Sequence, residues 1–168
     1  NSAQYIGGVV GKSEGASTKC TNYSDISVYS NGTIYCGGVA GYLYGSSENI
    51  FNYGYSLTVN SSSTGSSYEN YVGGVTGYSN SSLTNSYNTA KIDVTKGNVF
   101  TGGVCGYVKG FVSKAHFTSD INVNNSTSNT SSYTYVGGIA GKAGNGIEES
   151  SATGESITVN SKNNVYVG

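Results

Sequence analysis

The stretch Tyr35-Cys36-Gly37-Gly38-Val39-Ala40-Gly41 decides the fold of this chain, because versions of it recur along the whole sequence. Further copies begin at Tyr5, Tyr71, Phe100 and Tyr135, and a sixth starts at Tyr166. Each complete copy has an aromatic residue, a Gly-Gly pair, an aliphatic residue and a closing glycine at the same offsets. A repeat of this period is typical of solenoid proteins, in which each repeat forms one turn of the chain.

A second element follows each Gly-rich stretch at a nearly constant distance, and it alternates apolar and polar residues. Alternation with a period of two predicts a strand with one buried face. We expect two inward columns, formed by Ile26, Leu57, Ile92, Ile121 and Ile157 and by Val28, Val59, Val94, Val123 and Val159. The residues between them should face water, namely Ser27, Thr58, Asp93, Asn122 and Thr158.

A third, less regular segment lies between these two, as in Leu83-Thr84-Asn85-Ser86-Tyr87, and predicts a weaker strand. Nothing in the chain has the period of a helix. The sequence therefore predicts an all-β, single-stranded, right-handed parallel β-helix with three short strands per turn. It would have about 5.5 turns of about 30–36 residues, starting near residues 5, 35, 71, 100, 135 and 166. We expect one array over 1–168, as a segment of a longer protein or filament.

At the Gly-rich stretches the chain resembles the GLUG repeat family, named for Gly, Leu, an apolar residue and Gly. Val or Ile replaces Leu in the matching tetrads, which are Gly8–Gly11, Gly38–Gly41, Gly74–Gly77, Gly103–Gly106 and Gly138–Gly141. The third copy resembles the family pattern most closely. The resemblance implies a surface or secreted β-solenoid, including adhesin-like proteins, and it brings no catalytic residues.

The composition excludes several classes of function. The net charge is −1, 10% of residues are charged and there is no Arg, so the chain lacks the basic surface that nucleic acids require. No apolar run approaches the ~20 residues of a membrane span, so we expect no membrane insertion. Of the three cysteines, Cys20 and Cys36 could approach each other, whereas Cys105 should be a small packed side chain.

Catalytic and metal chemistry find little support. His116 is the only histidine, and no Ser or Asp constellation marks a triad around it. One His and three scattered Cys do not make a zinc site, and no cofactor motif is present. Glu148 and Glu149 are adjacent, so on a regular strand they should point to opposite faces. We therefore expect no enzyme, no metal and no cofactor.

The aromatic positions admit two interpretations, a structural column or a sugar-stacking platform, and the first is favoured because Phe100 lacks a hydroxyl. The expected ladder is Tyr5, Tyr35, Tyr71, Phe100, Tyr135 and Tyr166. By parity it should point inward with Val9, Val39, Val75, Val104 and Ile139. The opposite parity is also mostly apolar, so we expect another chain or a loop to cover ten residues: Ile6, Cys36, Val72, Thr101, Val136, Val10, Ala40, Thr76, Cys105 and Ala140.

Seven asparagines begin N-glycosylation sequons, and most fall in connections, where glycans are attached. They are Asn22, Asn31, Asn60, Asn80, Asn124, Asn125 and Asn129.

Together these observations favour a secreted or cell-surface structural segment, such as a stalk, a fibre or a filament subunit that associates with itself. The alternative is an adhesin module that binds a glycan, another protein or a host surface through its long loops or a flat solenoid face.

Overall fold

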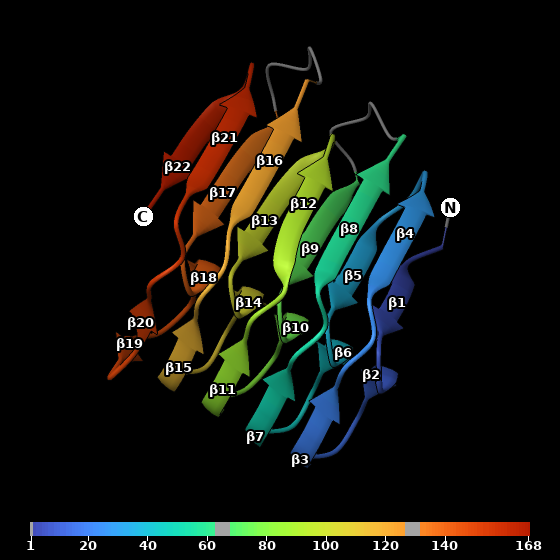
Figure 1. Ribbon diagram of the computed structural model, residues 1–168. Coiled ribbons are helices and arrows are strands. Elements are labelled where there is room, and N and C mark those ends of the chain that lie inside the picture. The colour runs from blue at the N-terminus through green and yellow to red at the C-terminus, as the bar shows by residue number, and fades with distance from the viewer. Residues whose placement is uncertain (1, 63–67, 127–131) are drawn as a thin grey trace.

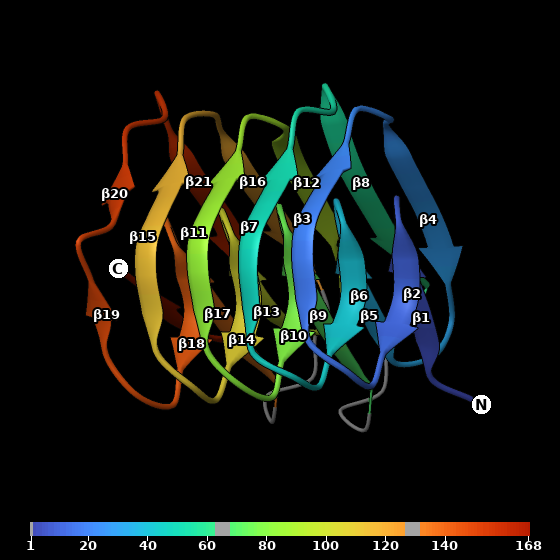
Figure 2. The same ribbon diagram turned by 90° about the horizontal axis from the view of Figure 1, so that it is seen from below.

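The computed structural model describes residues 2–62, 68–126 and 132–168, and over these residues the chain is all-β, without a helix. The strands form four parallel sheets, in which each strand pairs with the equivalent strand of the next turn. The turns lie side by side along one axis and wind in a right-handed sense, with the two termini at opposite ends (Figures 1 and 2). The predicted β-solenoid is therefore confirmed.

Two of the four sheets come from the Gly-rich stretches. Sheet A consists of β1 (Gln4–Gly7), β5 (Ile34–Gly37), β9 (Glu69–Gly73), β13 (Asn98–Gly102), β17 (Tyr133–Gly137) and β22 (Asn164–Val167). Sheet B consists of β2 (Val10–Ser13), β6 (Ala40–Leu43), β10 (Thr76–Ser79), β14 (Cys105–Val108) and β18 (Ala140–Ala143).

The other two sheets come from the remaining segments. Sheet C consists of β3 (Ser17–Asn22), β7 (Ser47–Asn52), β11 (Leu83–Asn88) and β15 (Val112–Phe117), followed by the short β19 (Ile147–Glu148) and β20 (Ser151–Ala152). Sheet D consists of β4 (Ile26–Ser30), β8 (Ser56–Ser61), β12 (Lys91–Thr95), β16 (Ile121–Asn125) and β21 (Ile157–Ser161).

Each full turn thus has four strands where three were predicted, because the Gly-rich stretch bends at its glycines and forms two strands. The bend brings backbones together more closely than a side chain allows. A Cβ atom on Gly74 would collide with the carbonyl oxygen of Gly103 and with the amide of Asn88. A Cβ on Gly77 would lie 2.5 Å from the backbone nitrogen of Cys36. The recurring glycines are therefore needed for close approach at the corner.

The two apolar columns of sheet D are confirmed residue by residue. Ile26, Leu57, Ile92, Ile121 and Ile157 are register partners along the sheet, and so are Val28, Val59, Val94, Val123 and Val159. In the central turns these side chains are almost completely buried, as Leu57 and Ile92 show. Ser27, Thr58, Asp93, Asn122 and Thr158 lie between them and are exposed or half-buried.

An asparagine ladder crosses three turns inside the core at the end of sheet C. The Asn22 amide nitrogen donates to Asn52 Oδ1 at 2.9 Å, and the Asn52 nitrogen donates to Asn88 Oδ1 at 2.8 Å. Asn88 ends the ladder by donating to the carbonyl oxygen of Gly103 at 2.9 Å. In the next two turns Phe117 and Ala152 occupy the equivalent position. Buried amides that are satisfied in this way fix the register of neighbouring turns.

Sheet C also contains a column of left-handed residues, one in each turn. Their φ angles lie between 47° and 58°, at Lys19, Asn49, Asn85, Lys114 and Glu149. Among the described glycines only Gly97 has a positive φ, and it lies with Lys96 in the turn after β12, so the glycines before the sheet C strands do not carry this conformation. Non-glycine residues adopt this conformation at an energetic cost. The kink is therefore held by the surrounding turns.

Candidate interaction surfaces

Two columns of rings line the outer corner where sheets A and B meet. The first is the expected ladder, and the second, not anticipated, follows the closing glycines and consists of Tyr42, Tyr78 and Tyr107 with Lys12 and Lys142 at its ends. Tyr71, Tyr78 and Phe100 form the centre of an apolar cluster separate from the main core. Aromatic residues directly after Gly41, Gly77 and Gly106 were the sequence signal for this second column.

The rings of the first column stack face to face from end to end. Successive centroids lie 4.8–5.0 Å apart and successive planes differ by 7–13°, from Tyr5 to Tyr166. Tyr78 contacts this column edge-on, with its centroid 5.3 Å from that of Tyr71. Every inner ring has both faces covered by its neighbours. The column therefore offers no inner ring face to a sugar, and its role is packing.

Burial changes the acid–base properties of this corner. It raises the pKa of Tyr35 to about 12, with smaller contributions from neighbouring tyrosines and Glu69. Burial, together with a short hydrogen bond donated by its hydroxyl to Glu69, also raises the pKa of Tyr71. Lys142 lies 5.3 Å from the ring centroid of Tyr107, a distance at which a cation is attracted to a ring face. The phenols of Tyr35 and Tyr71 therefore stay neutral at physiological pH.

The inward orientation predicted for the aliphatic residues after the Gly-Gly pairs is confirmed in the central turns, whereas the orientation predicted for the ladder and the cover expected over the ten other residues are wrong. The ladder points outward, whereas Val39, Val75 and Val104 lie in the main core. The ten residues expected to need a cover are all buried or half-buried within the chain itself. The bend between the two strands of the stretch changes the parity, so residues on both sides of the glycines face the interior. The chain needs no second chain or loop over this face.

The cysteines and the histidine form no catalytic constellation. All three cysteines are free thiols, so Cys20 and Cys36 are not joined. Cys105 is fully buried as a packed side chain, and burial raises the pKa of its thiol to about 12. The exposed His116 is paired with Ser151, with 2.9 Å between its Nδ1 and the serine Oγ. Among the described residues no group of His, Cys, Asp and Glu is arranged to hold a metal ion.

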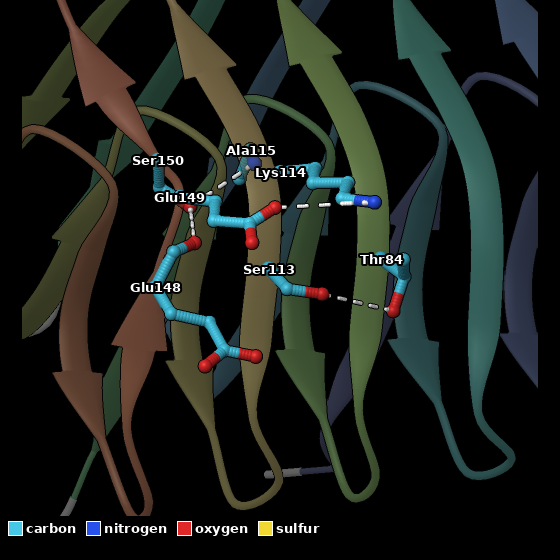
Figure 3. A network of polar contacts seen from close by, with 7 residues as sticks. All are labelled: Thr84, Ser113, Lys114, Ala115, Glu148, Glu149 and Ser150. Carbon is cyan, nitrogen blue, oxygen red and sulfur yellow. Dashed lines mark hydrogen bonds and ion pairs between the residues drawn. The ribbon is translucent and has the colours of Figure 1, made fainter.

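The outer face of sheet C carries a small polar network (Figure 3). Glu149 reaches Lys114 of the preceding turn, with 3.9 Å between Oε2 and Nζ, and Ser150 Oγ accepts the backbone N–H of Ala115 at 3.0 Å. Glu148 and Glu149 are both exposed on this face, which corrects the expectation that they point to opposite sides. The positive φ of Glu149 interrupts the strand alternation and turns both carboxylates outward. Both lie in solvent, and Glu149 is the partner of Lys114 in a surface ion pair.

The asparagines of the predicted glycosylation sequons differ in how deeply their side chains are buried. Asn22 is buried in the ladder, and Asn125 is buried with its amide donating to the Gly97 carbonyl at 2.7 Å, so neither can carry a glycan in the folded chain. Asn31 and Asn124 are exposed, whereas Asn60 and Asn80 are half-buried. Asn129 lies outside the described residues. Position in a connection did not distinguish these cases, because Asn125 ends a strand with its side chain inward.

A hollow opens at the C-terminal end of the solenoid. It has a volume of about 480 Å³ and is lined mainly by apolar residues, including Val136, Ile139, Ile147 and Val167. It lies where the interior of the last turns is uncovered. A shallower hollow of about 350 Å³ on sheet D is polar and is lined by Tyr29, Asn60, Thr95 and Asn124 among others. Neither contains a cluster of acids and bases.

Comparisons with known proteins gave a match for one turn of the solenoid. Neither the curated proteins nor the solved structures gave a match to the chain. Its described part contains no helix long and apolar enough to cross a membrane. Residues 132–159, in the fifth turn, match the family model described as the GLUG motif. From the sequence alone, the copy in the third turn resembles the family pattern most closely. This matched segment spans β17, β18, β19 and β20 and the start of β21, that is, almost one full turn. The fifth turn of this β-solenoid therefore carries a GLUG motif.

Proposed function

We propose that the chain is a structural segment of a secreted or cell-surface stalk, fibre or filament, and that it performs no catalysis. The observation that carries this proposal is the stacking of the turns, in which each strand pairs with the equivalent strand of the next turn and the apolar columns are buried between them. Each end exposes strand edges that another turn would pair with, and such edges readily associate. In a longer array or between copies, further turns would supply those partners.

The apolar residues at the ends support the same proposal. At the N-terminal end Tyr5 and Val9 are 39% and 50% exposed, whereas the equivalent Tyr71 and Val75 in the middle are 7% and 0% exposed. At the C-terminal end Ile157, Tyr166 and Val167 are exposed, next to the apolar hollow. Further turns, of a longer chain or of another copy, would cover these residues as the central turns cover Tyr71 and Val75.

The strand count shows what end-to-end stacking of this chain requires. Sheet A has six strands, because β1 and β22 both belong to it, whereas sheet B has five. A second copy that places β2 against β18 would bring its β1 into the space that β22 already occupies. Stacking without a gap therefore requires one of these two strands to leave its sheet.

Sedimentation velocity over a range of concentrations, followed by electron microscopy, tests the proposal. We expect slow, concentration-dependent assembly of the full chain and faster assembly of a chain lacking residues 164–168. Val9→Lys should block assembly by placing a charge on the stacking face, whereas Thr58→Lys on the outer face of sheet D should not. Assembly by neither chain, or equal assembly of the two lysine variants, would contradict end-on stacking.

A further inference from the structure

The turns from sheet C to sheet D carry two adjacent columns made only of rings and hydroxyls, here called the ring-and-hydroxyl face. The first column is Thr21, Phe51, Tyr87, His116 and Ser151, and the second is Tyr23, Tyr53, Thr89, Thr118 and Thr153. The first column lies near the ends of the sheet C strands, and the second lies in the connections that lead from these strands to sheet D. These segments lie side by side along the solenoid (Figure 1).

Backbone pairing sets this arrangement. Thr21, Phe51, Tyr87, His116 and Ser151 are register partners in sheet C. The second column continues two residues further along each turn. The backbone N–H of Tyr53 donates to the carbonyl of Asn22 in the previous turn, and that of Thr89 donates to the carbonyl of Asn52. The backbone beneath the face is therefore held in register by hydrogen bonds between the turns.

The aromatic half of the face is exposed and continuous. The rings of Tyr23 and Tyr53 have centroids 5.5 Å apart and planes 27° apart, and Phe51 lies 6.2 Å from Tyr53. Tyr87 meets Tyr53 edge-on at 5.7 Å. Tyr23 is 74% exposed and Tyr53 is 41% exposed, so ring surface is available to a ligand. Tyr23 and Tyr53 cover one ring face of each other, and the surface they leave open is larger than in the corner between sheets A and B, where neighbouring rings cover both faces of each inner ring.

The other half of the face is polar without carrying a fixed charge. His116 and Ser151 form a 2.9 Å pair, and the Tyr87 hydroxyl lies 3.4 Å from Thr118 Oγ1. None of the ten positions in the two columns is Lys, Arg, Asp or Glu. Hydroxyl and imidazole groups can both donate and accept hydrogen bonds.

We propose that the ring-and-hydroxyl face binds a neutral saccharide chain, with sugar rings on the aromatic half and sugar hydroxyls on the threonine and serine half. A pyranose has apolar C–H faces that pack on aromatic rings and equatorial hydroxyls that need partners of both kinds. A nucleic acid or an anionic glycan would require cationic side chains, which the face does not have. This role is additional to the proposed structural one and does not depend on assembly.

Affinity electrophoresis tests the proposal on the whole chain. Native gels are cast with a soluble β-glucan, an α-glucan, a galactomannan or, as the charged probe, a polyuronate. We expect retardation by at least one neutral polysaccharide and none by the polyuronate. The double variant Tyr23→Ala/Tyr53→Ala should bind about tenfold more weakly, the size of loss typical for an aromatic contact at the centre of a site.

The chain provides a matched control in Tyr29, which is 76% exposed and lies on sheet D away from this face. Tyr29→Ala should bind as the unmodified chain does. Thr118→Val keeps the side-chain shape and removes one exposed hydroxyl, and it should also weaken binding. Because this variant should fold, it tests the face even if the double variant does not fold. The proposal is overturned by failure of every neutral polysaccharide, by retardation with the polyuronate alone, or by equal binding of the double variant and Tyr29→Ala.

Discussion

The asparagine ladder makes a quantitative prediction about stability, centred on the substitution Asn52→Ala. The Asn52 side chain is 1% exposed and makes three hydrogen bonds. Its nitrogen donates to Asn88 at 2.8 Å, and its Oδ1 accepts from Asn22 at 2.9 Å and from the Gly54 backbone N–H at 3.3 Å. The substitution removes all three at once, in a place that water does not reach.

The expected loss follows from the groups left behind. Two buried donors lose their acceptor, one N–H of Asn22 and the N–H of Gly54. Asn88 Oδ1 keeps a partner, because it also accepts from the Ala90 backbone N–H at 3.0 Å. A buried polar group without a partner costs about 1–3 kcal/mol, so the free energy of unfolding should fall by about 2–6 kcal/mol. Such a loss is a large fraction of the stability of a typical domain, about 5–15 kcal/mol.

Urea unfolding followed by circular dichroism measures this loss, and Asn122→Ala provides the matched control. The Asn122 amide also donates a 3.0 Å hydrogen bond, to Asp93 of the previous turn, but it lies on the half-exposed outer face of sheet D. Water can replace that partner, so the control should lose no more than about 1 kcal/mol. Equal losses in the two variants would refute the conclusion that the buried ladder fixes the register of the turns.

Three further predictions concern the aromatic corner, the thiols and the glycines. Burial raises the pKa of Tyr35 from 10.0 to about 12, so the neutral phenol stabilises the folded chain fully below pH 10, and this stabilisation is lost as the pH rises through 12. Tyr35→Phe should therefore flatten the decline of the free energy of unfolding at alkaline pH. A thiol reagent should modify Cys20 alone in the folded chain and all three cysteines in urea, and rapid reaction of all three without denaturant would contradict the burial described. Gly74→Ala should prevent folding or lower the thermal midpoint by many degrees, whereas Gly15→Ala, where an added Cβ meets nothing within 4 Å, should leave it unchanged.

The inward columns of sheet D were predictable from the sequence because they depend on two simple rules. Alternation fixes which side of a strand is buried, and a constant spacing from the Gly-Gly pair fixes the register between turns. Ile26 and Ile157 belong to one column although 131 positions separate them, and both were assigned to it from spacing alone. Local pattern and long-range pairing agree here, as expected of a repeat.

The surfaces were harder to predict because backbone bends change which side a residue faces. Within the Gly-rich stretch the bend divides one expected strand into two, and it turned the ladder beginning at Tyr5 from the inside to the outside. Within sheet C the positive φ at Glu149 places it on the same side as Glu148. No residue-type preference marks such a kink at Lys or Glu. The exposed pair Tyr23 and Tyr53 was missed because each follows a strand and belongs to no repeated motif.

The stacked rings of the sheet A–B corner give the chain a built-in optical reporter. Its six parallel rings, five of them tyrosines, have centroid spacings of 4.8–5.0 Å, at which the electronic transitions of neighbouring tyrosines couple, and the chain contains no tryptophan. Each ring comes from a different winding of the backbone, so the coupled signal depends on adjacent windings staying in contact. Fraying from either end would shorten the stack one chromophore at a time, and the spectrum would record how far it had progressed.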